Sequence, residues 1–232
     1  MTDELSQPLV IAARSGDMGA IQAAVEKDRN VLKQCDNEYR TVMWYAAQSG
    51  HLELVKYLAE QEKKLVTTCC MEGISPLDAA ADRGHAAVVK FLVTAEPKMA
   101  AISDPDGGHP LLSAVNSGSL ECVEAIFPHA DLKQRNSIGE NNMLHLAVGN
   151  RNVPIVEFLA RNHPSYCTEQ NAVGNTALHL AVDVGDIEVA KVVVRYTPKE
   201  AFSIVNANGQ TARDMAKPGS EVALLVEEQI AP

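Results

Sequence analysis

Histidine and cysteine, the residues here with the widest range of chemistry, both recur at a regular spacing. His145 and His179 lie 34 residues apart in matching Leu-His-Leu-Ala stretches, and Cys35 and Cys69 are also 34 residues apart. A histidine can act as a general base and a cysteine as a nucleophile, but each needs a partner group within hydrogen-bond reach. The chain has no such partner at a spacing typical of catalytic sites. We therefore predict no catalytic residues, and the alternative of an enzyme or enzyme fragment has no sequence support.

Metal and cofactor sites are not predicted either. The stretch Asp104-Pro-Asp-Gly-Gly begins like a calcium loop but lacks the closing Glu at the twelfth position. Gly107-Gly108 is not part of a phosphate-binding glycine motif. The cysteines form no CxxC pair and have no zinc-type spacing; they are Cys35, Cys69, Cys70, Cys122 and Cys167.

Charge and composition favour a protein partner. Thirty acidic residues against 20 basic ones give a net charge of −10, which repels nucleic acids and anionic membranes and favours a basic or mixed polar and apolar protein surface. The N-terminus has no signal-peptide pattern, and the most apolar window, residues 86–95, is far shorter than the roughly 20 residues of a membrane helix. An odd number of cysteines without the spacing of a disulfide framework fits a reducing compartment. We expect a soluble monomer in the cytoplasm, with the nucleus as an alternative.

A repeat of about 34 residues organises the whole chain. The stretch Asn175-Thr-Ala-Leu-His-Leu-Ala-Val-Asp-Val-Gly-Asp matches Arg40-Thr-Val-Met-Trp-Tyr-Ala-Ala-Gln-Ser-Gly-His position by position. A fixed period of this length is the signature of a repeat fold. The predicted helix-starting positions have spacings of 34, 34, 33, 34 and 35, and one more step back reaches Gln7; after Gln7 they are Thr41, Ser75, His109, Asn142, Thr176 and Thr211.

Each position in the repeat has a physical role. Thr, Ser or Asn at the start can cap a first helix by accepting backbone N–H bonds. The Leu and Ala residues that follow place small apolar groups on one helix face. A glycine such as Gly50 or Gly84 then permits the left-handed turn that starts a second, antiparallel helix. The repeat therefore predicts a stack of helix pairs.

This pattern resembles the ankyrin repeat, whose hallmark Thr-Pro-Leu-His-Leu-Ala-Ala is nearly reproduced by Thr176-Ala-Leu-His-Leu-Ala-Val and Ser75-Pro-Leu-Asp-Ala-Ala-Ala. The resemblance implies an all-α solenoid of about seven helix-turn-helix units with short hairpin loops, and a structural role for His145 and His179. We expect one domain over residues 1–232, with the first repeat and a helix at residues 220–230 as caps. The usual Gly-Ala-Asp after the second helix is replaced by stretches such as Glu96-Pro-Lys-Met and Thr197-Pro-Lys-Glu, whose conformation is left open.

The resemblance also implies where a partner binds, because hairpin tips and first-helix ends line a concave surface in ankyrin proteins. The helix-end candidates are Gln48, Asp82, Arg83, Asn116, Asn150 and Asp183. The hairpin candidates are Asn37, Glu38, Arg40, Met71, Glu72, Ile74, Asp106, Asn141 and Asn175. Five acids against two bases make this surface mildly acidic, and its Asn, Met and Ile residues suit a mixed polar and apolar interface.

Trp44, the chain's single tryptophan, is a further candidate because it occupies the histidine slot of the repeat. It is either packed between repeats or exposed at one edge beside Arg40 and Gln48, where it could anchor a partner.

The sequence therefore predicts a non-catalytic scaffold or adaptor that binds a protein on its concave face. One alternative is a proteasome assembly chaperone of the gankyrin type, which the chain resembles more weakly because Leu180-Ala-Val-Asp-Val lacks the Leu-x-Cys-x-Glu motif of that type. Another is a microbial effector or an enzyme-targeting subunit.

Cys35 and Cys69 hold the same place in adjacent repeats, but stacked helical units lie about 8–10 Å apart, whereas the Cα atoms of a disulfide must come within about 7 Å. A thiol titration of protein purified without reductant should therefore find all five cysteines free. Fewer than five would contradict the prediction.

Overall fold

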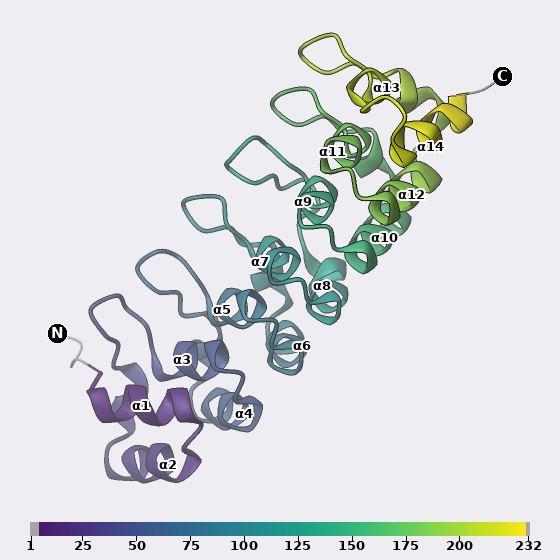
Figure 1. Ribbon diagram of the computed structural model, residues 1–232. Helices are drawn as coiled ribbons and strands as arrows, with labels where there is room; N and C mark the ends of the chain where they lie inside the picture. The colour runs from purple at the N-terminus through teal and green to yellow at the C-terminus, as the bar shows by residue number, and fades with distance from the viewer. Residues whose placement is uncertain (1–4, 231–232) are drawn as a thin grey trace. The chain divides into compact units, whose positions relative to one another are not determined.

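The computed structural model describes residues 5–230, which fold into helices and hairpin loops (Figure 1). The chain divides into two compact units, Met1–Leu132 and Lys133–Pro232, named here the N-terminal and C-terminal units. The expectation of a single domain stays a prediction. An isolated bridge pairs Val205 with Thr211, and the described residues form no strand, so the predicted all-α class is confirmed.

The N-terminal unit holds four helix pairs. Their first helices lie side by side in one layer and their second helices form another (Figure 1). The pairs are α1 (Gln7–Ser15) with α2 (Met18–Lys27), α3 (Val42–Gln48) with α4 (Leu52–Gln61), α5 (Pro76–Asp82) with α6 (Ala86–Ala95), and α7 (Pro110–Ser117) with α8 (Leu120–Ile126).

The C-terminal unit holds three further pairs: α9 (Met143–Gly149) with α10 (Val153–Asn162), α11 (Ala177–Val184) with α12 (Ile187–Tyr196), and α13 (Ala212–Met215) with α14 (Glu221–Ile230). The last of these helices packs on α12, which confirms the closing helix predicted at residues 220–230. In the part of the chain that is described, none of the helices is long and apolar enough to cross a membrane.

The predicted helix starts are confirmed from Thr41 onward, where the six residues occupy the N-cap positions of α3, α5, α7, α9, α11 and α13. The Thr41 hydroxyl, for example, accepts a hydrogen bond from the Trp44 amide at 3.3 Å. The prediction for Gln7 was wrong by one residue. Ser6 holds the N-cap position of α1, and Gln7 is already helical, because Pro8 is pre-set for a first helical turn.

Small buried residues allow the first helices to pack closely. Ala46, Ala80 and Ala114 occupy the same repeat position in the N-terminal unit and are completely buried, as are Ala147 and Ala181 in the C-terminal unit. A larger side chain at this position would force the backbones apart. The sparse aromatic content of the chain is therefore matched by a core built from Ala, Val, Leu and Ile.

The connections after the second helices, left open by the sequence, are short 3₁₀ helices. Glu96-Pro-Lys-Met leads into η3 (Pro97–Ala101), and Thr197-Pro-Lys-Glu leads into η6 (Lys199–Ser203). The others are η1 (Arg29–Lys33), η2 (Lys63–Thr67), η4 (Phe127–His129) and η5 (Pro164–Cys167). Tight turns of this kind satisfy carbonyls at the end of the preceding helix by i→i+3 bonds.

Histidines join adjacent repeats in the N-terminal unit. Nε2 of His51 donates to the Arg14 carbonyl at 2.7 Å, and Nε2 of His85 donates to the Gln48 carbonyl at 3.0 Å. The His85 ring packs on Gly50, where a Cβ atom would lie 2.6 Å from the ring and where φ is +80°. A glycine is therefore required at Gly50 for both its conformation and its space.

In the C-terminal unit, histidines make the equivalent link at the hairpin end. Nδ1 of His145 accepts from the Asn142 amide at 3.2 Å, and Nε2 donates to the Asn175 carbonyl at 3.0 Å. His179 repeats the arrangement with Thr176 and with the Gln210 carbonyl. The structural interpretation of both histidines is thereby confirmed.

The His145 ring also makes this unit sensitive to acid. Burial lowers its pKa to about 4, against about 6.5 in an unfolded chain. As pH falls, the unfolded state takes up the proton first, so the stabilisation from the neutral ring is complete above pH 6.5 and is lost between pH 6.5 and 4. This difference in pKa corresponds to about 3 kcal/mol.

We therefore expect His145→Gln to be less stable than wild type at pH 7.5, and the gap in unfolding free energy to shrink by roughly 3 kcal/mol on acidification to pH 4. Urea denaturation at a series of pH values measures the gap. A gap that is the same at all pH values would show that His145 does not titrate between the two states.

Candidate protein-binding surface

The hairpin loops have a fixed backbone. Each is closed by a hydrogen bond across its base, as from the Asp104 amide to the Gly108 carbonyl at 2.8 Å. In most of them an Asp or Asn side chain also accepts bonds from backbone N–H groups two and four residues on; Asp36 does so from Glu38 and Arg40, both at 2.9 Å. Such Asx turns hold the chain in one conformation. The tips therefore present their side chains in defined positions.

Neighbouring hairpins within a unit are also joined to one another. In the N-terminal unit the Met71 amide donates to the Glu38 carbonyl at 2.7 Å. In the C-terminal unit the Ala172 amide donates to Gly139 and the Ala207 amide to Val173. The third N-terminal hairpin lies close to the second, because a Cβ atom on Gly73 would be 2.8 Å from Pro105, so each unit carries a row of hairpin tips.

Asn141 and Asn175, two predicted contact residues, take part in this row. The side-chain oxygen of Asn141 accepts from Asn171 at 2.9 Å, and that of Asn175 accepts from Asn206 at 3.0 Å. Both residues are half-buried. They fix the tips in place, and their role in contacting a partner stays a prediction.

Most of the other predicted contact residues lie at the surface. The exposed ones are Asn37, Glu38, Met71, Glu72, Asp82, Arg83, Asp106, Asn116, Asn150 and Asp183, and the half-buried ones are Arg40, Gln48 and Ile74. Trp44 is buried, with 6% of its surface exposed, so it does not present the exposed edge considered from the sequence.

The acidic character of the surface belongs to the N-terminal unit. Glu38 pairs with Arg40, and Asp82 lies 3.5 Å from Arg83. Glu72 and Asp106 make no ion pair within the described residues. The C-terminal unit contributes a single predicted acid, Asp183, and its hairpin tips are mostly amides and aliphatic residues.

Large apolar side chains stand exposed on the tips of both units. Met71 is 61% exposed and Tyr39 56%; in the C-terminal unit Ile138 is 81% exposed and Val173 56%. Met71 was among the predicted contacts, and Ile138 and Val173 belong to the hairpin tips that were predicted to line the binding surface. Tyr39 was missed, although it stands where the other hairpins have a glycine such as Gly73 or Gly174, and that departure was visible in the sequence.

A polar hollow of about 380 Å³ opens in the N-terminal unit between the first two repeats. Two guanidinium groups lie over aromatic rings there: Arg14 is 4.8 Å from the centre of the Tyr45 ring, and Arg40 is 4.9 Å from that of Trp44. The Tyr45 hydroxyl donates to Asp36. Burial, together with this bond to Asp36, raises the pKa of Tyr45, which therefore stays protonated as a donor.

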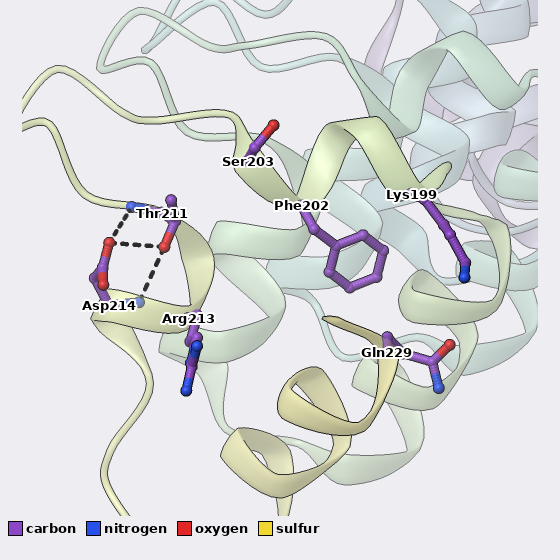
Figure 2. A pocket seen from close by; sticks show the side chains of 7 residues that line it. All are labelled: Lys199, Phe202, Ser203, Thr211, Arg213, Asp214 and Gln229. Carbon is purple, nitrogen blue, oxygen red and sulfur yellow. Dashed lines mark hydrogen bonds between the residues drawn. The ribbon is translucent and has the colours of Figure 1, made fainter. Parts of the chain in front are cut away.

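A second hollow, of about 440 Å³, lies at the end of the C-terminal unit (Figure 2). The Phe202 ring points into it, with Lys199 and Gln229 at its side. Arg213 lies 3.5 Å from Glu227. The hydroxyl and carboxylate of Thr211 and Asp214 in this hollow belong to the capping box of α13.

Other buried ionisable groups have structural roles. Burial raises the pKa of the Cys167 thiol to about 11 and that of Asp78 to about 6, and Asp78 accepts bonds from the Ser75 amide and hydroxyl in a capping box. Cys69 and Cys35 are half-buried free thiols. Across residues 5–230, no group of three His, Cys, Asp or Glu side chains is placed to hold a metal ion.

Stacked helix pairs with exposed hairpin tips define a helical repeat protein, a class that commonly uses its extended surface for binding. The family described as ankyrin repeats (3 copies) matches residues 3–69, 61–136, 111–204 and 144–226. The chain belongs to the ankyrin repeat family.

Solved structures agree on the fold. The ankyrin repeat domain of human ASB11 aligns with a TM-score of 0.81 and 23% identity, over 98% of this chain and 99% of that one. The ankyrin repeat domain of Bcl-3, described as a unique member of the IkappaB protein family, aligns with a TM-score of 0.82 and 20% identity, over 97% and 100%.

The burial of Trp44 can be checked by fluorescence, because no other tryptophan contributes to the signal. We expect emission at shorter wavelength than that of a tryptophan in water, and little quenching by iodide, until the protein is unfolded. Emission and quenching equal to those of the unfolded chain would place Trp44 at the surface.

Proposed function

We propose that this protein is a non-catalytic interaction scaffold that binds a partner protein through its hairpin tips and first-helix ends. The observation that carries the proposal is the set of large apolar side chains held outward on tips whose backbone is fixed, with Met71 and Ile138 61% and 81% exposed. Exposed apolar groups cost free energy in water unless a partner covers them. A fixed backbone reduces the entropy lost on binding.

The partner chemistry differs between the units. In the N-terminal unit, Met71 lies beside the unpaired acid Glu72, and Asp106 is on the next hairpin, so a basic segment with apolar side chains is the complementary partner. In the C-terminal unit, the hairpins of Ile138 and Val173 carry amides and one exposed acid, Glu140, which suits a largely uncharged surface.

Several features support binding without catalysis. His145, His179 and Asp78 are used in caps and repeat-to-repeat bonds, and burial raises the pKa of the Cys122 and Cys167 thiols. The free cysteines and the acidic charge also fit the cytoplasm or nucleus as the place of action.

The partner can be sought by affinity purification of the tagged protein from its native cell, followed by mass spectrometry. Recovery of a specific protein that binds the purified chain directly would support the scaffold. Recovery of proteasomal ATPase subunits would favour the assembly-chaperone alternative, and absence of any direct binder would contradict both.

Reversing two charges tests the surface itself. The double variant Glu72→Lys, Asp82→Lys should bind the captured partner at least tenfold more weakly, because repulsion replaces attraction at the interface. Both side chains are exposed, so its unfolding midpoint should match wild type. Titration calorimetry measures the affinity.

The matched control reverses Glu60 and Glu124, which are exposed on the second helices α4 and α8 of the same unit. This control keeps the same net charge as the test variant and should bind like wild type. Equal weakening in both variants would mean that overall charge, and not the tip surface, determines binding.

A further inference from the structure

The first hairpin tip of the N-terminal unit carries a tyrosine at a position where the repeat otherwise uses glycine. Tyr39 has φ of +60°. Left-handed backbone is readily adopted by glycine but is costly for a residue with a Cβ atom. The tyrosine is therefore kept at this tip at a cost to stability. The equivalent residues of the later hairpins are all glycines with positive φ: Gly73, Gly107, Gly139, Gly174 and Gly209.

Contacts within the chain do not offset this cost. The Tyr39 side chain is 56% exposed. In the part of the chain that the structure describes, it makes no hydrogen bond and stacks on no other ring. A strained residue whose side chain is left uncovered is a sign of function, because no internal contact accounts for it.

We propose that Tyr39 is the main specificity-determining residue of the tip surface of the N-terminal unit, which consists of the hairpins 36–40, 70–74 and 104–108. Its ring, together with Met71, receives an apolar side chain from a basic segment of the partner protein. The proposal rests on the proposed function and adds the residue and the partner chemistry that determine selectivity.

Met71 completes the apolar contact. Its amide donates to the Glu38 carbonyl at 2.7 Å, so Met71 lies against the residue that precedes Tyr39 in the chain. The Met71 side chain is 61% exposed. Tyr is among the residues most enriched at binding hot spots, and a flexible Met side chain adapts to the shape of an apolar group. The two side chains offer an apolar contact on a backbone that hydrogen bonds hold in place.

The charges of the second and third hairpins determine the class of partner. These hairpins carry Glu72, Asp104 and Asp106, and no basic residue. Asp104 accepts the Asp106 and Gly108 amides at 2.9 and 2.7 Å. Glu72 and Asp106 are exposed and form no ion pair within the described residues. Lys or Arg side chains are complementary to this uncompensated negative charge.

The other charged groups of this surface are balanced. In the hollow beside the first hairpin, Arg14 and Arg40 face Asp36 and Glu38. At the end of α5, Arg83 pairs with the acid that precedes it. The uncompensated charge is therefore on the second and third hairpins, while the exposed aromatic ring stands on the first.

This arrangement imposes an order on the partner segment. Stacked repeats lie about 8–10 Å apart, and an extended chain covers that distance in about three residues. An apolar residue beside Tyr39 is then followed, at steps of about three, by basic residues that reach Glu72 and Asp106. A segment with acids at those two places is repelled.

The experiment titrates ¹⁵N-labelled protein with a blocked peptide built to this order, acetyl-Ala-Phe-Ala-Ala-Lys-Ala-Ala-Lys-amide, and follows the backbone amide signals. Two companion peptides replace either the Phe by Ala or both Lys by Glu. We expect saturable shifts in the hairpins 36–40 and 70–74 with the first peptide, and at least tenfold weaker binding of each companion.

Tyr39→Gly should bind the first peptide about tenfold more weakly, because the ring is lost. Its urea midpoint should not fall, because glycine adopts left-handed backbone without strain. Tyr39→Phe keeps the ring and should bind as wild type does. The matched control is Leu224→Ala on α14 of the C-terminal unit, which removes an apolar side chain of similar exposure, 53%, and should leave the affinity unchanged.

Absence of saturable shifts, equal affinity for the three peptides, wild-type affinity in Tyr39→Gly, or an equal loss in Leu224→Ala would overturn the role of Tyr39. If the peptides fail to bind while reversal of Glu72 and Asp82 still weakens binding of the captured partner, the scaffold function stands and only this contact falls.

Discussion

The placement of the hairpin tips and helix ends depends on hydrogen bonds that run from one repeat to a backbone carbonyl of its neighbour. His51 and His85 make such bonds at the helix turns of the N-terminal unit, and His145 and His179 make them at the hairpins of the C-terminal unit. A neutral imidazole is suited to this task, because one nitrogen can accept locally while the other donates across the repeat boundary. These bonds satisfy backbone carbonyls at the helix ends and hairpin bases of the neighbouring repeat.

These bonds occupy polar groups inside the repeat, so the residues available to contact a partner lie at its outer positions. Buried polar groups such as Asp78, His145 and His179 are used to cap helices or join repeats, so their freedom to react is small. The residues that packing does not determine are those on the hairpin tips and helix ends. There the two units differ: acids with Met71 and Tyr39 in one, and amides with Ile138 and Val173 in the other.

Much of the fold was predictable because the repeat constrains each position physically. Thr41, Ser75 and Asn142 cap helices as their side chains require, and Gly50 and Gly84 take the left-handed backbone that their position demands. The 3₁₀ connections were less predictable, because Pro97 and its neighbours depart from the family sequence and several conformations are compatible with them.

The binding surface was predictable only in outline. Repeat position identifies which residues lie near a tip, but it does not say which side chains are used internally. Asn141 and Asn175 carry the polar groups expected of contacts, yet they bond to neighbouring hairpins. Trp44 is buried beneath Arg40. The left-handed backbone of Tyr39 is a property of the folded chain, although its departure from glycine could be read from the sequence.

Hydrogen exchange of the protein with and without its captured partner tests the central claim most directly. The account predicts slower exchange on binding in the hairpins, at residues 36–40 and 70–74 of the N-terminal unit and at the tips of the C-terminal unit, with little change in α4, α6 and α12. Protection confined to those second helices, with unchanged hairpins, would contradict it.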